Sequence, residues 1–230
     1  MFSYHLAELT ARTTAWAMTH PMSADQVPGL LHAETLAFMQ LGSPTLSPKR
    51  MQLRWAAVFA RWEDADALDR FLDGHRFGVE LSTGWHVRME FLRRYGALAC
   101  FPDLPMRAGN WDNQEPAVAV TLARLKLPQL PRFLKWGKPV ERLVVSHPGA
   151  CIALAAMRPP RHFSTFSIWR TIEEMTEMVH GNSDIPNAAV HAAAMREQVR
   201  LDFHHESAFM RFRTLSEHGH WQGRNRLLPR

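Results

Sequence analysis

The chain has 230 residues, of which 46% are hydrophobic and 21% charged, a composition typical of one globular unit or of two small halves that share a core. This composition excludes intrinsic disorder, a collagen helix and a coiled coil. The net charge is +5, and no run of Lys or Arg in the sequence is longer than two residues. We therefore expect no nucleic-acid partner.

The sequence also lacks the apolar segments that direct a chain into or across a membrane. Its longest uncharged run, residues 143–157, is interrupted by His147 and Pro148, and a bilayer span needs ~20 apolar residues. The N-terminal segment carries Glu8 and has no positive start followed by an apolar core, unlike a secretory signal. We therefore expect a cytoplasmic protein.

The first half of the chain is predicted to follow the order strand, helix, strand, strand, helix, strand. It opens with a strand at residues 3–8 and a short helix near 13–18, and a second strand follows at 32–41. Near-alternate apolar residues and then helical spacing predict a strand and a helix within residues 58–74. A closing strand is predicted at 85–95.

The second half is predicted to repeat this order. Its elements are a strand at 117–126, a short helix at 130–136, a strand at 150–157, a strand and a helix within 165–181, and a closing strand at 207–215. Strand, helix, strand, strand, helix, strand is the ferredoxin-like order.

An internal repeat links the two halves. VFARWEDADALDRFLDG (residues 58–74) and TFSIWRTIEEMTEMVHG (residues 165–181) align without a gap at an offset of 107. Thr171 followed by Glu174 fits a capping box, and each copy ends in a glycine where a left-handed helix cap is expected. The matched pairs include Phe59 with Phe166, Trp62 with Trp169 and Gly74 with Gly181.

We therefore predict an α+β fold in which two ferredoxin-like repeats pack as a single dimeric-type α/β barrel with a central cavity. The N-terminal half covers residues 1–105, a Pro- and Gly-containing connector covers 106–116, and the C-terminal half covers 117–230. The C-terminal half carries about 16 more residues before its last strand than the first half does, and an inserted helix is predicted within 187–204.

Sequence motifs narrow the possible chemistry. The spacing HExxH is absent, and His204, His205 and Glu206 are adjacent, so their side chains should point apart rather than converge on one metal ion. Cys100 and Cys151 are too few for a disulfide framework or a four-thiolate site, and reduced, buried thiols are expected. Glycine-rich phosphate loops and a GxSxG nucleophile elbow are also absent.

The remaining possibility is a site in which a single histidine binds a large organic cofactor. His191, Met195 and Val199 are spaced by four and should share one face of the inserted helix. Haem needs one axial donor in an apolar slot and cationic groups near its propionates. The alternative is that His191 lies at the edge of the core and hydrogen-bonds to a carbonyl. In that case the arginines are solvated and the aromatic residues only pack in the core. The candidate anion partners are Arg196, Arg200, Arg211 and Arg213.

Three segments resemble the C-terminal signature of spheroidene monooxygenase, a bacterial carotenoid ketolase family. They are STFSIW (residues 164–169), the helix that begins at His191, and ESAFMRFRTLSEHGHWQGR (residues 206–224), and they contain the patterns TFSxW, ExxFxRF and GxWxG. A weaker match runs through Arg12, Trp16, Met18, Pro28, Gly29 and the segment WAAVFARWED.

The resemblance implies a haem-dependent oxygenase that hydroxylates a methylene of a linear carotenoid, repeats the step and loses water to leave a ketone. It implies haem b as cofactor, a reduced ferredoxin-type electron donor, and His191 as the ligand of the iron. The residues expected around the cofactor are His191, Met195, Arg196, Arg200, Arg211, Phe166 and Trp169.

Charge distribution adds an expectation about membranes. Residues 116–230 hold 16 basic and 9 acidic residues, against 11 and 13 in residues 1–115, so the C-terminal half could rest on anionic headgroups of the inner membrane as a peripheral contact. Two other functions stay open. One is a cofactor-free barrel that binds or oxygenates a hydrophobic small molecule. The other, an RNA-binding module, lacks the aromatic, glycine-containing strand that such modules use.

Overall fold

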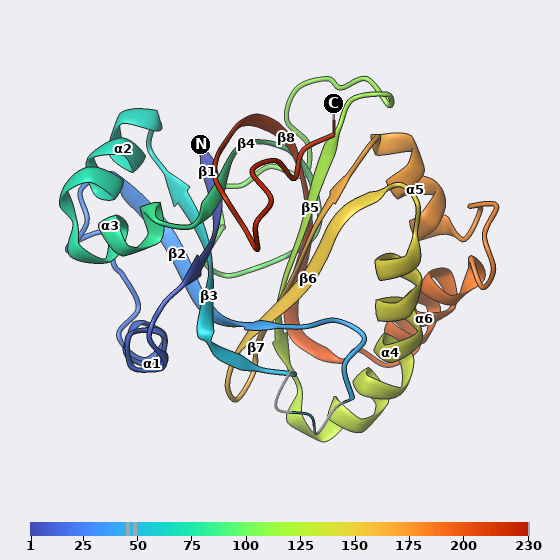
Figure 1. Cartoon of the computed structure of the whole chain (residues 1–230). Coiled ribbons are helices and arrows are strands. Elements are labelled where there is room, and N and C mark those ends of the chain that lie inside the picture. The colour runs from blue at the N-terminus through green and yellow to red at the C-terminus, as the bar shows by residue number, and fades with distance from the viewer. Residues whose placement is uncertain (45–46, 48–49, 230) are drawn as a thin grey trace.

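The computed structural model describes residues 1–44, 47 and 50–229. In the first half of the chain, the strands alternate with three helices that gather on one side of the molecule (Figure 1). The elements are β1 (Phe2–Glu8), α1 (Ala11–Thr19), β2 (Leu30–Met39), β3 (Gln52–Trp62), α2 (Ala65–Gly74), α3 (Arg76–Ser82) and β4 (Trp85–Ala97).

The second half repeats this arrangement on the opposite side (Figure 1). Two helices precede the last strand in each half, so the helix predicted within residues 187–204 is present but corresponds in order to α3 and is not an addition to the repeat. The elements are β5 (Ala117–Leu125), a short 3-10 turn (Leu127–Gln129), α4 (Leu130–Ser146), β6 (Ala150–Arg158), β7 (His162–Trp169), α5 (Ile172–His180), α6 (Ala189–Arg200) and β8 (His204–Gly219).

All eight strands belong to one antiparallel sheet whose pairing closes on itself in the order β1-β3-β2-β6-β7-β5-β8-β4. Each half contributes four strands in the ferredoxin-like order, β4-β1-β3-β2 and β8-β5-β7-β6. The halves join through a short pairing of β2 with β6 and a long pairing of β4 with β8. The prediction of a ferredoxin-like α+β fold is confirmed.

The space enclosed by the strands is filled by side chains. Tyr4 of β1 and Phe166 of β7 stack there with ring centroids 4.0 Å apart, and both are fully buried. The expected central cavity is therefore wrong, because inward-pointing aromatic rings from both halves occupy it. The largest of these residues are Phe2, Tyr4, Phe59, Trp85, Phe91, Phe166 and Phe212.

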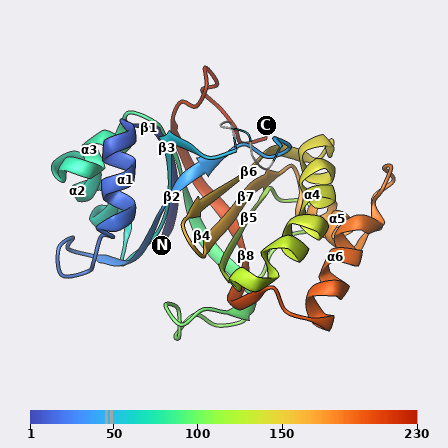
Figure 2. The same cartoon turned by 90° about the horizontal axis from the view of Figure 1, so that it is seen from below.

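The helices form two outer layers, α1 to α3 on the first four strands and α4 to α6 on the other four (Figure 2). The first layer closes tightly on its sheet, where Val58 is 1% exposed and Ala60 is fully buried beneath Leu68 and Phe71 of α2. The second layer packs chiefly through α5, whose Met175 and Met178 cluster with the buried Leu143 of α4.

The internal repeat is a structural repeat, because β3 and β7 both end at its tryptophans and α2 and α5 begin three residues later. Thr171 accepts a 3.1 Å hydrogen bond from the amide of Glu174, and Gly181 ends α5 with φ +79°. The left-handed cap predicted at Gly74 is wrong, since the helix there passes through His75 directly into α3.

Candidate functional site

The repeat lets the two sheet faces beneath the helices be compared position by position. Val58 and Ala60 of the first half correspond to Thr165 and Ser167 of the second. The first two are sealed from solvent by α2, whereas Thr165 and Ser167 are only half-buried although they lie mid-strand. At these two strand positions, solvent therefore reaches the sheet beneath the second helix layer and does not reach it beneath the first.

Five small residues form a continuous surface on this face, which we call the small-residue patch. Ser167 of β7 lies between Ala119 of β5 and Ala153 of β6, and Thr165 lies opposite Thr121. All five are half-buried. Ala119 also packs against the cluster that α5 forms with Leu143, so the helices cover this face in part. The small-residue patch consists of Ala119, Thr121, Ala153, Thr165 and Ser167.

His191 lies on the inward face of α6. At 3.6 residues per turn, it is on the opposite side from the exposed Ala189 and Arg200, and none of the helix's residues is fully buried. Its Nδ1 lies 3.0 Å from the carbonyl oxygen of Val179 at the end of α5. That carbonyl can only accept, so Nδ1 carries the proton and Nε2 keeps its lone pair.

Nε2 of His191 is open. Within the part of the chain that the structure describes, no hydrogen bond to it is formed, and it is not one of the buried side-chain atoms left without a partner. Burial lowers the pKa of His191, the nearby His180 lowers it further, and the bond to Val179 opposes both. The imidazole is therefore neutral at pH 7. A neutral ring whose other nitrogen is fixed to a carbonyl is the form in which histidine binds a metal.

Arg211 of β8 borders the small-residue patch, where it pairs with Ala119. It is half-buried, and its Nη2 donates a 3.0 Å hydrogen bond to the hydroxyl of Thr176 on α5. Burial and the neighbouring Arg93 lower the pKa of Arg211 to about 10, so the guanidinium keeps its charge. No carboxylate of the described residues forms an ion pair with it, so its charge is available to an anion.

The other two arginines predicted on α6 do not join this site. Arg196 is exposed, and both Nε and Nη2 of Arg200 donate 2.7 Å hydrogen bonds to Glu197 at the surface. The helical period places Arg200 half a turn away from His191. Met195 lies on the same side as His191 and is half-buried, whereas Val199, the end of the expected apolar face, is 79% exposed.

The two aromatic residues expected around a cofactor lie elsewhere. Phe166 points into the closed sheet and is on the opposite face from Thr165 and Ser167, so it cannot share a pocket with His191. Trp169 is on the helix side but fully buried, with its indole nitrogen 2.9 Å from the Ser167 hydroxyl and its ring against His147. It supports α5 and does not line an opening.

Two further groups considered from the sequence have structural roles. Arg213 holds the connector to β8 through Glu115 and the carbonyl of Asn110, and it also pairs with Glu90 of β4. His204 is buried and His205 exposed, while Glu206 accepts a 2.7 Å hydrogen bond from the amide of Ala99. The side chains of the neighbouring His204 and His205 therefore point to opposite sides of the strand.

The sequence interpretation missed the small-residue patch and the two partners on α5, Thr176 and Val179. A signal for the patch was present, because the repeat replaces Val58 and Ala60 with the smaller or more polar Thr165 and Ser167. Nothing in the spacing indicated that Thr176 would contact Arg211, since 35 residues separate them.

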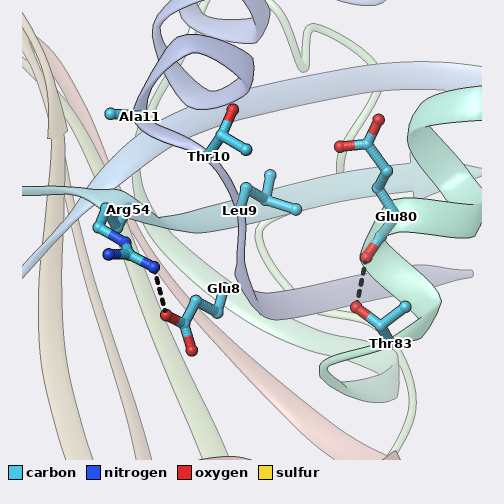
Figure 3. A pocket seen from close by; sticks show the side chains of 7 residues that line it. All are labelled: Glu8, Leu9, Thr10, Ala11, Arg54, Glu80 and Thr83. Atoms are coloured by element: carbon cyan, nitrogen blue, oxygen red, sulfur yellow. Dashed lines mark hydrogen bonds and ion pairs between the residues drawn. The ribbon is translucent and has the colours of Figure 1, made fainter.

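A separate pocket lies on the first half, away from these residues (Figure 3). Glu8 and Arg54 form an ion pair of 3.3 Å at one side of it, and the Thr83 hydroxyl donates to the carbonyl of Glu80 at the other. The pocket is lined by Glu8, Leu9, Thr10, Ala11, Arg54, Glu80 and Thr83. It contains none of the residues predicted to bind a cofactor.

No protein-family model and no curated protein sequence matches the chain. Among solved structures, it is similar to an aldoxime dehydratase in complex with butyraldoxime, at 9% identity, over 94% of this chain and 79% of the other, with a TM-score of 0.48. A monooxygenase-like protein from Listeria innocua shows 13% identity, covers 94% and 96%, and has a TM-score of 0.30. A haem-degrading enzyme from Listeria monocytogenes shows 11% identity, covers 90% and 98%, and has a TM-score of 0.29. These likenesses are distant, so the function is inferred from the site itself.

Proposed function

We propose that the second helix layer binds haem b, with His191 as the ligand of the iron, and that the chain is a haem-dependent oxygenase. The observation that carries the proposal is the open Nε2 of a neutral His191, whose other ring nitrogen is fixed by Val179. The closed pairing of the two four-stranded sheets supports the dimeric-type α/β barrel expected from the sequence.

The remaining residues of the site fit the same group. The small-residue patch gives a flat apolar ring a place against the sheet, and Arg211 offers a charge to a propionate carboxylate. Haem, when bound, supplies the activation of dioxygen. His191 would hold the iron of the cofactor, and Arg211 would hold one of its carboxylates.

The substrate class rests on the resemblance to spheroidene monooxygenase. We propose a linear carotenoid or a similarly long apolar molecule, with a reduced ferredoxin-type protein as electron donor. Because aromatic side chains fill the interior of the sheet, such a substrate would bind on the helix side, beside the small-residue patch. Burial of its chain would supply the binding free energy, at about 25 cal/mol per Å² of apolar surface.

Within residues 1–44, 47 and 50–229, no helix is both long and apolar enough to cross a bilayer. We propose a peripheral contact through the start of α4 and the end of α6, where Val199 and Leu201 are exposed close to Leu127 and Leu130. Arg132 links these segments by donating to the carbonyl of Leu201. Exposed apolar residues flanked by Arg196 and Arg200 fit an anionic membrane surface.

Filling the small-residue patch should block the cofactor without unfolding the chain. Thr165→Phe is expected to weaken hemin binding about tenfold by steric exclusion, with little change in the free energy of unfolding because the site is half-open. The matched change in the first half, Val58→Phe, should cost ~1–3 kcal/mol by overpacking and leave hemin binding intact. Absorbance titration and urea unfolding measure both effects. Unchanged affinity in Thr165→Phe would place the cofactor elsewhere.

Removing the free guanidinium should weaken the cofactor's carboxylate contact. Arg211→Gln is expected to lower hemin affinity by about tenfold or more, since hydrogen bonds to charged groups contribute ~1.5–3 kcal/mol. Arg200→Gln is the control, because Arg200 already pairs with Glu197 at the surface. The same loss in both variants would show that only the overall charge matters.

A further inference from the structure

A second cluster of reactive groups lies inside one end of the closed sheet, on the opposite face of the strands from the small-residue patch. Glu34 of β2 points inward in line with Leu36 and is 2% exposed. Its carboxylate pairs with Arg124 of β5 and, at 3.1 Å, with Arg158 of β6. These two arginines fix the carboxylate and neutralise it in the core.

The loop after β4 closes this end of the sheet and brings a cysteine to Glu34. Phe101 and Leu104 are buried in the interior cluster, which anchors the loop, and Asp103 pairs with Arg61 at 2.7 Å. Cys100 directly precedes Phe101 and is half-buried. The loop therefore holds the thiol at a defined place rather than in open solvent.

His32 connects the thiol to the carboxylate. Its Nε2 lies 3.2 Å from Glu34 Oε1, and its ring packs edge-on against Phe101 with centroids 4.9 Å apart. The ligating atoms of His32, Glu34 and Cys100 all lie within 4.8 Å of one another. A thiol, an imidazole beside it and a carboxylate that orients the imidazole form the arrangement that activates a cysteine nucleophile.

The electrostatic environment is consistent with this arrangement. Burial alone would lower the pKa of His32, but its hydrogen bonds and charge interactions with Cys100 and Glu34 outweigh burial and raise it to about 9. The ring therefore stays protonated at pH 7 and can stabilise a thiolate. The other titratable or charged groups around the three residues are Arg61, Asp103, Arg124, Arg158, His162 and Glu206.

We propose that Cys100 is a nucleophilic thiol, paired with His32 and oriented through Glu34, that is oxidised by hydroperoxides. The thiolate sulfur attacks the terminal oxygen of the hydroperoxide, and an S–O bond forms as the O–O bond breaks. The sulfur loses two electrons and becomes a sulfenic acid, while the hydroperoxide is reduced to an alcohol whose oxygen takes the proton of His32. This site goes beyond the proposed haem chemistry and does not depend on it.

The same three side chains are close enough together to hold a metal ion, but the surrounding charges favour the thiol chemistry. Both carboxylate oxygens of Glu34 already accept hydrogen bonds from guanidinium groups, and His32 would have to release a proton before it could bind a cation. A carboxylate neutralised in this way is a weak ligand for a divalent ion.

Cys151 provides the internal control for the first test, because burial raises the pKa of its thiol. The full chain, purified without added hemin, is treated with iodoacetamide, and each cysteine is quantified by peptide mass spectrometry. We expect Cys100 to be alkylated at least about tenfold faster than Cys151 at pH 7. Equal rates, or faster reaction of Cys151, would overturn the proposal, and this comparison needs no variant to fold.

A second test identifies the role of the histidine and the oxidised product. His32→Gln should slow alkylation of Cys100 about tenfold and leave that of Cys151 unchanged. One equivalent of tert-butyl hydroperoxide followed by dimedone should label Cys100 in the wild type and in Cys151→Ser, and no residue in Cys100→Ser. An unchanged rate in His32→Gln, or dimedone labelling confined to Cys151, would contradict the proposal.

Discussion

Replacing His191 with alanine is expected to abolish the specific binding of hemin while the chain stays folded. His191 offers an open, neutral nitrogen lone pair, and without it the iron would lose its protein ligand. We expect affinity to fall on the order of 100-fold or more, since loss of even an outer partner of a metal ligand costs ~10–100-fold. The Soret band measures the binding, and far-UV circular dichroism measures the fold.

His205→Ala is the matched control for that change, because His205 is exposed and pairs with no residue of the small-residue patch. It should bind hemin as the wild type does. Hemin binding of equal strength in His191→Ala and His205→Ala would mean that another residue holds the iron, or that hemin adheres to the surface without ligation.

The second large effect concerns three histidines that stack across β1, β4 and β8, where the two halves of the sheet join. His5 lies opposite His86, and His86 lies opposite His218, with ring centroids 5.0 and 4.7 Å apart. Both ring nitrogens of His86 are buried without a partner. Burial, together with the charges of His218 and Arg88, lowers the pKa of His86 to about 4.

This stack should make the protein less stable as the pH falls from about 6.5 to about 4. In that range the unfolded chain binds a proton at His86 and the folded chain does not, so the free energy of unfolding rises with pH. A shift from 6.5 to about 4 corresponds to about 3 kcal/mol, present in full above the unfolded pKa and lost as the folded pKa is approached. Urea unfolding at pH 7, 5.5 and 4 measures this loss.

His86→Phe should remove that part of the pH dependence, because phenylalanine keeps the stacked ring and does not titrate. The comparison of variant with wild type is needed because the pKa values of His204 and His5 are also lowered. His32, whose pKa is raised to about 9, contributes the same stability throughout this range. An identical loss of stability on acidification in His86→Phe and wild type would show that the stack does not titrate as described.

The order of the helices and strands could be predicted from the sequence, because apolar periodicity indicates it in each half and the repeat relates the two halves. The lengths of the elements could be predicted less well. The helix expected at residues 130–136 continues to Ser146 through Pro139, because packing of Leu143 and the pairing of Glu141 with Arg50 stabilise the turns beyond the proline. Helix α3 was missed, since Gly74 was interpreted as a terminator although its φ is not positive.

The candidate site could be predicted in part. A spacing of four residues puts Met195 on the same side of α6 as His191, and the same helical period puts Arg200 on the opposite side. In TFSIW, successive side chains of the strand point to opposite faces, so Phe166 lies on one face and Thr165 and Ser167 lie on the other. The sequence does not show which face points into the closed sheet. That depends on pairing between strands far apart in the chain, such as β4 with β8.

The central claim is that a neutral imidazole on α6 captures the iron of haem, and the most direct test is a hemin titration of the unaltered chain followed at the Soret band. The account predicts saturation at one hemin per chain, with a shifted and sharpened band that is absent in free hemin. A spectrum that remains that of free hemin at all protein concentrations would contradict it.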